Sequence, residues 1–236
     1  MKRLLLLSFL ALAATVRAAF DPSAYPPPVP PLVARAPDPG AWTIQVQLPV
    51  PAAPSAPADA AAPKPHQLVQ IQSAQAGGLK RDVLAYLDGA TLELWYADGM
   101  LLKPAGPGQP VMVVDLAAQA RLDKDERGDP VLAAGFPGLG WITLARFDQV
   151  ALFQREPCYH YVLKPGDGGG NGSGAEAWIA AKTGLPVACQ RDGLLYVYTF
   201  GDGPRSLALP PAYAEARAAY AKIQDRRRQL EKDLGK

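Results

Sequence analysis

Between His66 and Phe200 the chain repeatedly alternates polar and apolar side chains with a period of two. This period is typical of β-strands that pack one face against a core. Asp88-Gly89 and Asp98-Gly99 each follow such a run, and Asp-Gly between alternating runs is a strong indication of a tight hairpin turn. The strands predicted on this basis are 66–72, 80–87, 91–96, 111–114, 141–145, 150–153, 159–163, 175–180, 185–189 and 194–200.

A succession of about ten short strands without long helical crossovers predicts a mainly antiparallel sheet. A flat open sheet of this width would expose an apolar face, so we expect the α+β, mainly β class, with a strongly curved sheet or half-barrel. The only long helical stretch is terminal, where Pro211 suits a helix start and Gly235 a helix stop. Its first turns are expected to pack on the sheet, and its charged remainder to project into solvent.

The amino-terminal residues predict where the protein works. Met1–Arg3 is cationic, an apolar run follows to Ala14, and small residues close the segment at Ala18-Ala19. This arrangement is typical of a secretory signal peptide over 1–19, cleaved near Ala18-Ala19, and it predicts a periplasmic or secreted protein. The apolar run is shorter than the about twenty residues that a membrane-spanning helix needs. We therefore expect no transmembrane segment.

Proline sets the character of the next segment. Residues 20–64 are rich in Pro and Ala, favour extended backbone and offer few large apolar residues for a core, so we expect a largely disordered linker. Within it, residues 42–48 alternate well enough to form a strand that pairs with the edge of the domain. The β half-barrel domain is then expected over 65–210, and the charged helix over 211–236.

Charge and motifs argue against several classes of function. The net charge of +2, from 24 Lys+Arg and 22 Asp+Glu, provides no basic surface for nucleic acid. Neither His66 nor His160 has a neighbouring catalytic partner or a full set of metal ligands in the sequence. The Gly-rich run 166–174 lacks the Gly-Lys-Ser/Thr ending of a phosphate-binding loop. We expect no enzyme, no metal and no cofactor.

The cysteines leave two alternatives open. A pair of cysteines in a secreted chain favours a disulfide. If the strands that carry Cys158 and Cys189 are separated by the strand 175–180 in a simple meander, however, the two residues lie two strands apart. That is about 10 Å at ordinary strand spacing, beyond the ~7 Å between Cα atoms that a disulfide allows. The sequence does not decide between a disulfide and two free thiols.

The segment 177–187 resembles a hairpin of the LolA-type periplasmic lipoprotein carriers, whose fold the RseB and LppX groups share. Thr183-Gly184-Leu185-Pro186 forms the matching turn, and Ala180 stands where the family often has Asp. The resemblance implies a curved antiparallel half-barrel closed by helices, with an apolar cavity for acyl chains. Two features depart from the family: a Pro-rich stretch replaces its amino-terminal helix, and no residue here is matched to its cavity-gating Arg.

Two function hypotheses follow from these patterns. In the first, a non-enzymatic periplasmic binding protein holds a lipid or lipoprotein acyl chain on the concave face of the sheet. In the second, the chain is an envelope scaffold without a small-molecule ligand, and it contacts an envelope protein through the Pro-rich arm or the terminal helix. An open, curved apolar sheet favours the first. The hypothetical apolar lining consists of Trp95, Trp141, Phe153, Trp178, Tyr196, Tyr198 and Phe200.

Overall fold

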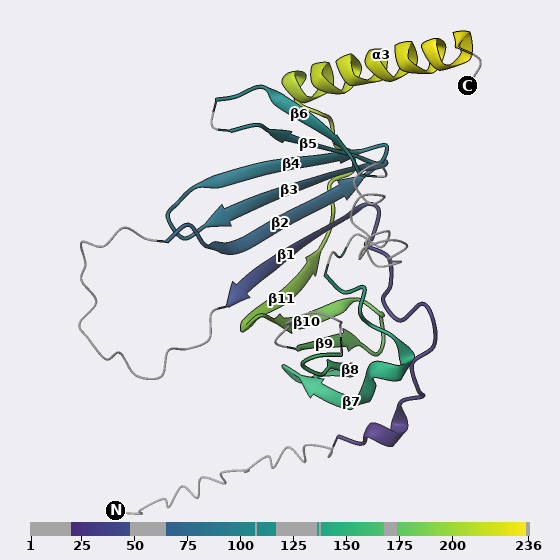
Figure 1. Ribbon diagram of the computed structural model, residues 1–236. Coiled ribbons are helices and arrows are strands. Elements are labelled where there is room, and N and C mark those ends of the chain that lie inside the picture. Colours follow the sequence, from purple (N-terminus) through teal and green to yellow (C-terminus); the bar gives the residue numbers. More distant parts are fainter. Residues whose placement is uncertain are drawn as a thin grey trace, which may run out of the picture.

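The structure is a computed structural model, and it describes residues 20–47, 65–106, 108–116, 136, 138–167 and 174–234. The predicted signal peptide over 1–19 and the part of the predicted linker over 48–64 lie outside these ranges. In the described part of the chain, an 11-stranded antiparallel sheet is followed by a carboxy-terminal helix, which confirms the predicted fold class (Figure 1). The elements are η1 Pro22–Ala24, β1 Gly40–Gln47, β2 Leu68–Ala76, β3 Leu79–Tyr86, β4 Thr91–Ala97, β5 Met100–Pro104, β6 Val111–Asp115, η3 Leu144–Arg146, β7 Phe147–Phe153, β8 Glu156–Leu163, β9 Ala175–Ala180, β10 Pro186–Arg191, β11 Leu194–Gly201 and α3 Pro211–Asp233.

The sheet consists of two meanders joined by the first strand of the chain. Its order is β6-β5-β4-β3-β2-β1-β11-β10-β9-β8-β7, so β1 pairs with β2 on one side and β11 on the other (Figure 1). The predicted pairing at an edge is therefore wrong, and folded structure begins inside the stretch interpreted as a linker. The physical reason is burial: Trp42, Ile44 and Val46 are only 3%, 7% and 8% exposed, which requires neighbouring strands and a core beneath them.

The hairpin prediction at Asp98-Gly99 is confirmed. These two residues link β4 to β5, and both have positive φ, 49° for Asp98 and 74° for Gly99. Positive φ at both loop positions matches the twist of the flanking strands, and Asp and Gly tolerate it best. β5 itself was not among the predicted strands, because the adjacent Leu101 and Leu102 obscure its alternation.

The predicted strand over 141–145 is wrong. Trp141 lies in a turn, and Leu144–Arg146 form the short 3-10 helix η3. The Ile142 amide donates to the carbonyl of Leu139 at 3.1 Å, and the Ile142 side chain is only 7% exposed. The apolar residues of this segment thus pack as a plug against the sheet instead of extending it.

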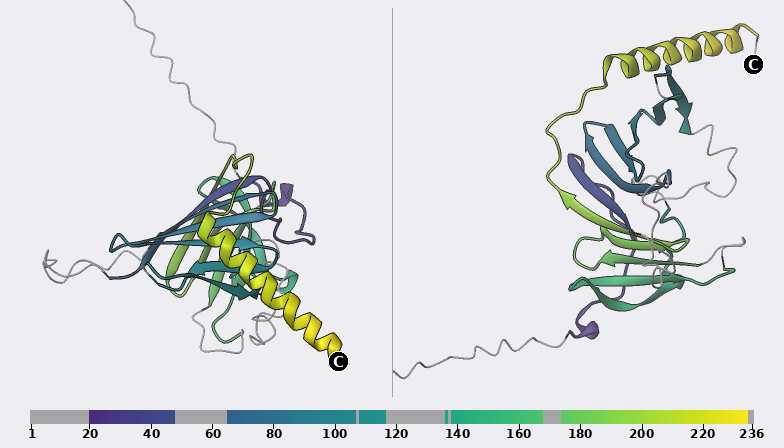
Figure 2. Two further views of the ribbon diagram at one scale, coloured as in Figure 1. Left: turned by 90° about the horizontal axis from the view of Figure 1, so that it is seen from above. Right: turned by 90° about the vertical axis from the view of Figure 1, so that its left-hand side faces the viewer.

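The sheet is strongly curved, and its two faces have different partners (Figure 2). We call the concave face, which carries Trp42, Phe200 and Ser73 at matching register positions, the inner face. The opposite, convex face is the outer face; there Trp95 lies opposite Arg81 and Leu102. The chain after β11 runs along the outer side to α3 (Figure 2).

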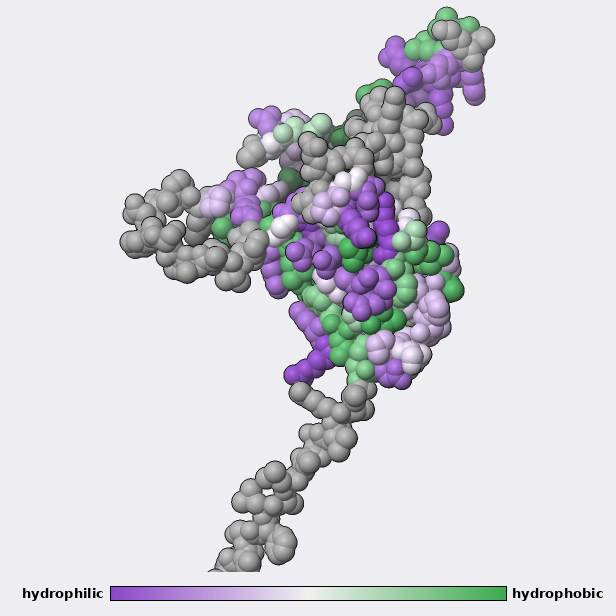
Figure 3. All heavy atoms as spheres, turned by 60° about the horizontal axis from the view of Figure 1, so that its bottom comes forward, coloured by the Kyte–Doolittle hydropathy of each residue, from purple (hydrophilic) through white to green (hydrophobic). Residues whose placement is uncertain are grey.

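The inner face of β1 and β7–β11 is filled by the chain itself. Val33, Phe136, Leu139 and Ile142 pack on it and are at most 7% exposed. Phe136 contacts Trp42 in an edge-to-face arrangement, with ring centroids 5.5 Å apart. Seen from the β7 end, apolar side chains gather over the lower part of the body next to hydrophilic ones (Figure 3). The other members of this core are Ile44, Tyr161, Ala177, Ile179, Cys189 and Tyr198.

Helix α3 docks through its first three turns. The Tyr220 hydroxyl donates to Asp115 Oδ2 at 3.4 Å, and Arg217 forms an ion pair with Asp98. Beyond Tyr220 every described side chain except the partly buried Gln224 is exposed, and the helix extends past the sheet (Figure 1). Among the described residues, no helix combines the length and apolar character needed to cross a bilayer.

Candidate ligand-binding face

The inner face of β2–β6 carries apolar side chains that belong to neither buried core cluster, although Ile71 borders one of them. Cross-strand register places Ile71, Leu84 and Leu92 in one row, and Tyr96, Leu101 and Val114 in another. All are partly buried, and Met112 on the same face is 42% exposed. The apolar members are Ile71, Leu84, Leu92, Leu94, Leu101, Met112 and Val114. Among the described residues, this half of the concave face therefore presents apolar side chains, while core residues fill the other half.

A polar cluster interrupts this apolar surface near its centre. Lys80 Nζ lies 3.0 Å from Asp82 Oδ2, and the two side chains are only 15% and 9% exposed. The same ammonium group lies 5.5 Å from the ring centroid of Trp42 and 4.8 Å from that of Tyr96. Contacts between a desolvated cation and aromatic rings are favourable, so the rings help to hold Lys80 in place.

Asp82 has further consequences for its neighbours. Burial raises the pKa of the Tyr96 hydroxyl, and the charge of Asp82 together with a hydrogen bond to it raises that pKa further. Asp82 Oδ1 is buried and has no hydrogen-bond partner among the described residues. Because Oδ1 is covered by its neighbours, a donor on the inner face can reach it only when a neighbouring side chain moves aside, and the oxygen can then accept a hydrogen bond.

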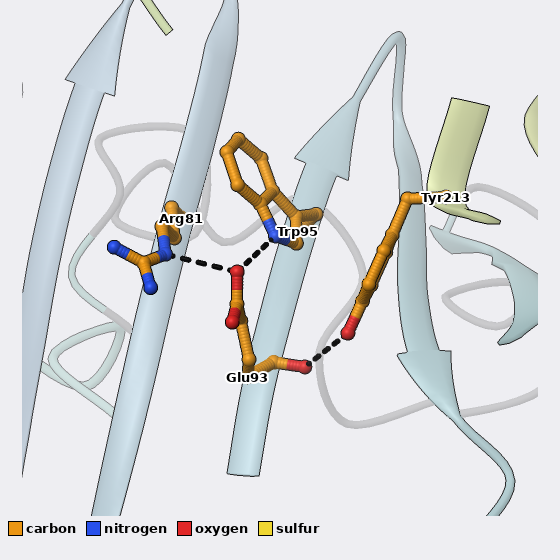
Figure 4. Close-up of polar contacts among 4 residues, drawn as sticks. All are labelled: Arg81, Glu93, Trp95 and Tyr213. Carbon is orange, nitrogen blue, oxygen red and sulfur yellow. Dashed lines mark hydrogen bonds and ion pairs between the residues drawn. The ribbon is translucent and has the colours of Figure 1, made fainter. Parts of the chain in front are cut away.

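The outer face of β3 and β4 carries a second polar cluster (Figure 4). Arg81 Nε and Trp95 Nε1 both donate to Glu93 Oε1, at 2.9 and 2.6 Å. The Tyr213 hydroxyl donates to the Glu93 carbonyl at 3.3 Å and so ties the start of α3 to β4. Leu207, Leu209 and Tyr213 pack over Trp95 and Leu102, so this part of the outer face is occupied.

The outer face of β7–β9 holds His160 between two carboxylates. Its Nδ1 lies 3.2 Å from Asp148 Oδ2, and its Nε2 lies 3.1 Å from Glu176 Oε2. The ring stacks on Trp178, with centroids 5.0 Å apart and an interplanar angle of 21°. Both ring nitrogens are thus engaged, and the cluster connects three strands. These partners come from different strands, which is why adjacency in the sequence did not reveal them.

The hypothetical lining residues lie in three separate places. Trp141, Tyr196, Tyr198 and Phe200 belong to, or pack against, the core on the inner face. Trp95 is under the segment that leads to α3, on the outer face. Phe153 and Trp178 are also on the outer face, where their ring centroids lie 5.0 Å apart. The structure therefore does not bring these residues together on one surface.

Both cysteines are free and buried in the structure, which decides between the alternatives that the sequence left open. Cys158 lies opposite Ala180 on β9, and Cys189 lies opposite Ala177 on the same strand. In the described part of the chain, no three potential metal ligands are grouped to hold an ion.

Sequence reasoning missed the Lys80–Asp82 cluster, although a signal was present. Lys80, Asp82 and Leu84 share one face of β3 by period two, and Leu84 belongs to the apolar set. Two charged residues at apolar-face positions indicate a buried polar site. Arg81 masked this signal, because the run Lys80-Arg81-Asp82 resembles a solvated strand end.

Comparison with known proteins yields only structural likeness. No family model matches the chain, and no curated protein matches it. Among solved structures, the crystal structure of the Mycobacterium tuberculosis lipoprotein LppX matches with a TM-score of 0.39 and 8% sequence identity, covering 72% of this chain and 88% of that one. A likeness at this TM-score carries no argument, so the function proposed below rests on the geometry of the inner face.

Proposed function

We propose that the protein is a non-enzymatic binding protein that holds an acyl chain against the inner face of β2–β6. The observation that carries this proposal is the row of partly buried apolar side chains, including Leu84, Leu92 and Leu94, that lies on a concave face outside the buried core. Each methylene group of an acyl chain that leaves water contributes about 0.8 kcal/mol to binding. A chain laid across several strands would thus gain affinity without any directional contact.

The location of this activity is part of the proposal. The predicted signal peptide over 1–19 supports a role outside the cytoplasm, where lipids and lipoproteins need an apolar carrier surface. Charge agrees with such a ligand, because a net charge of +2 creates no strong field that would select a polyanion. The ligand class proposed is a lipid or the acyl anchor of a lipoprotein.

A second candidate function has its own observation. The carboxy-terminal half of α3 extends beyond the sheet and is exposed except for the partly buried Gln224, with Ile223 and Leu230 at 62% and 54%. Such a helix could contact an envelope protein, which would make the sheet a scaffold. The two functions differ in whether the inner face binds lipid.

The test uses a fluorescent fatty-acid probe and a pair of variants in adjacent residues. Leu84 faces inward and Val83 faces outward on β3, and both are partly buried. Leu84→Gln should weaken probe binding by about tenfold, the effect of losing about 1.4 kcal/mol of apolar contact. Val83→Gln should leave the affinity within about twofold of the native value. Equal effects of the two variants, or a native chain that binds no probe, would favour the scaffold.

A further inference from the structure

The Lys80–Asp82 cluster lies inside the apolar surface that the proposed function assigns to an acyl chain. Asp82 lies opposite Ser73 on β2 and opposite Leu94 on β4, so it faces the same side as the apolar row. Its residue exposure is 6%. Burying a charged pair costs free energy that packing alone does not return, so a stability role is a weak explanation for it.

One polar atom of the cluster also lacks a hydrogen-bond partner. Among the described residues, the buried side-chain atoms without a hydrogen-bond partner are Asp82 Oδ1, Trp141 Nε1 and Tyr161 Oη. Trp141 and Tyr161 belong to the filled half of the inner face, where core residues surround them. Of these three atoms, only Asp82 Oδ1 lies in the apolar half of the inner face, where the acyl chain would bind. A buried acceptor without a partner is costly, and a bound donor would remove that cost.

The charges of the cluster restrict the donor. Lys80 and Asp82 are 3.0 Å apart, so together they present almost no net charge to a ligand. A charged head group of either sign would lose its hydration in this partly buried place, and a pair with almost no net charge returns little Coulomb energy to offset that loss. An uncharged hydroxyl or amide N–H loses less hydration and can donate to Oδ1.

We propose, building on the acyl-chain function above, that the ligand is an amphiphile with an uncharged, hydrogen-bond-donating head group and that Asp82 Oδ1 accepts its hydrogen bond. Lys80 is a positioning residue, because its ion pair with Oδ2 and its contacts with Trp42 and Tyr96 leave Oδ1 as the free acceptor. The apolar row then provides affinity, and the cluster provides selectivity between head groups.

The test compares four ligands that share one hydrocarbon chain: a monoacylglycerol, the methyl ester, the carboxylate and the alkylamine. Direct titration on the full mature chain should show that the monoacylglycerol binds about tenfold tighter than the methyl ester, as one additional hydrogen bond predicts. The carboxylate and the alkylamine should also bind more weakly than the monoacylglycerol. Equal affinity for the monoacylglycerol and the ester would overturn the role of Asp82.

Two double variants separate the cluster from the strand that carries it. Lys80→Met/Asp82→Leu replaces the buried pair with apolar residues of similar size, an exchange that proteins generally tolerate. It should bind the monoacylglycerol and the ester with equal affinity. The matched control, Arg81→Met/Glu93→Leu, removes the outer-face ion pair of the same two strands and should keep the tenfold preference. A preference that survives loss of the Lys80–Asp82 pair contradicts the inference, whereas failure of all four ligands to bind overturns the acyl-chain function itself.

Discussion

Cys158 and Cys189 lie on opposite faces of the sheet, with β9 between their strands. Cys158 shares the outer face with His160, and Cys189 lies opposite Tyr196 on the inner face. Two strand spacings across the sheet and an offset of three residues along β9 place their backbones about 14 Å apart, and their side chains point to opposite faces. The fold therefore excludes a disulfide between these two cysteines.

The first prediction concerns thiol reactivity. Burial raises the pKa of the Cys158 thiol to about 11 and that of Cys189 to about 12. Both groups are therefore protonated near neutral pH and react slowly, because the thiolate is the nucleophile. An alkylating reagent should add to neither cysteine in the native protein and to both after unfolding without reductant, as measured by intact mass. A disulfide-linked mass in the unfolded, unreduced sample would contradict this arrangement.

The second prediction is a loss of stability at alkaline pH. The unfolded thiols lose their protons near pH 9, whereas the folded ones keep them to about 11 and 12. Between these values the unfolded state binds fewer protons than the folded state. The free energy of unfolding therefore keeps its full value below pH 9 and falls as the pH rises above it. We expect a fall of about 4 kcal/mol between pH 9 and 11 in urea titrations, with about 2 kcal/mol from each thiol. Cys158→Ala/Cys189→Ala should reduce this slope without abolishing it, because burial also raises the pKa of tyrosines such as Tyr161, to about 12. An unchanged slope would assign the whole effect to those tyrosines.

The third prediction tests the β9–β10 turn. Gly184 has φ of +69°, and a Cβ at this position would lie 3.3 Å from Ala34 Cβ. The Gly184 carbonyl accepts a hydrogen bond from the Ala34 amide at 2.7 Å, which fixes the amino-terminal segment to the turn. Gly184→Val should destabilise the protein by about 2 kcal/mol, through backbone strain and displacement of Ala34.

The control for that variant is Gly89→Val, in the β3–β4 turn. Gly89 also has positive φ, +89°, but no atom lies within 4 Å of the position that a Cβ would take there. Gly89→Val should therefore be destabilised by backbone strain alone, and by less than Gly184→Val. Chemical denaturation measures the free energy of unfolding of both variants. Equal losses for the two variants would show that the contact with Ala34 contributes nothing.

The fourth prediction separates the docked and projecting parts of α3. Removing residues 225–236 should change the free energy of unfolding by less than about 0.5 kcal/mol, because the described side chains of this part are exposed. Removing the chain from Leu207 onward uncovers Trp95 and Leu102, which are 4% and 0% exposed, and should cost at least about 3 kcal/mol. Denaturant titration of the two truncated chains measures the difference, and comparable losses would contradict the docking described for α3.

The fold class and most of the strands followed from the sequence because period-two alternation and Asp-Gly turns are local signals. The position of β1 did not, since its partners β2 and β11 are set by burial of Trp42 and not by neighbouring residues in the chain. The plug at Ile142 was mistaken for a strand because an apolar run does not reveal whether it extends a sheet or packs on one. The division of the sheet into a filled and an apolar half, and hence the placement of Asp82, depends on the same long-range contacts.

The most direct test of the acyl-chain function maps where a lipid lies. A fatty acid with a photoreactive group near the end of its chain would be irradiated with the purified mature protein, and the labelled peptides would be identified by mass spectrometry. The account predicts labels on inner-face residues of β3 and β4, such as Leu84, Leu92 and Leu94. Labels confined to the outer-face hollow of about 370 Å³ bordered by Thr43, Gln72 and Arg81, or no specific label, would contradict it.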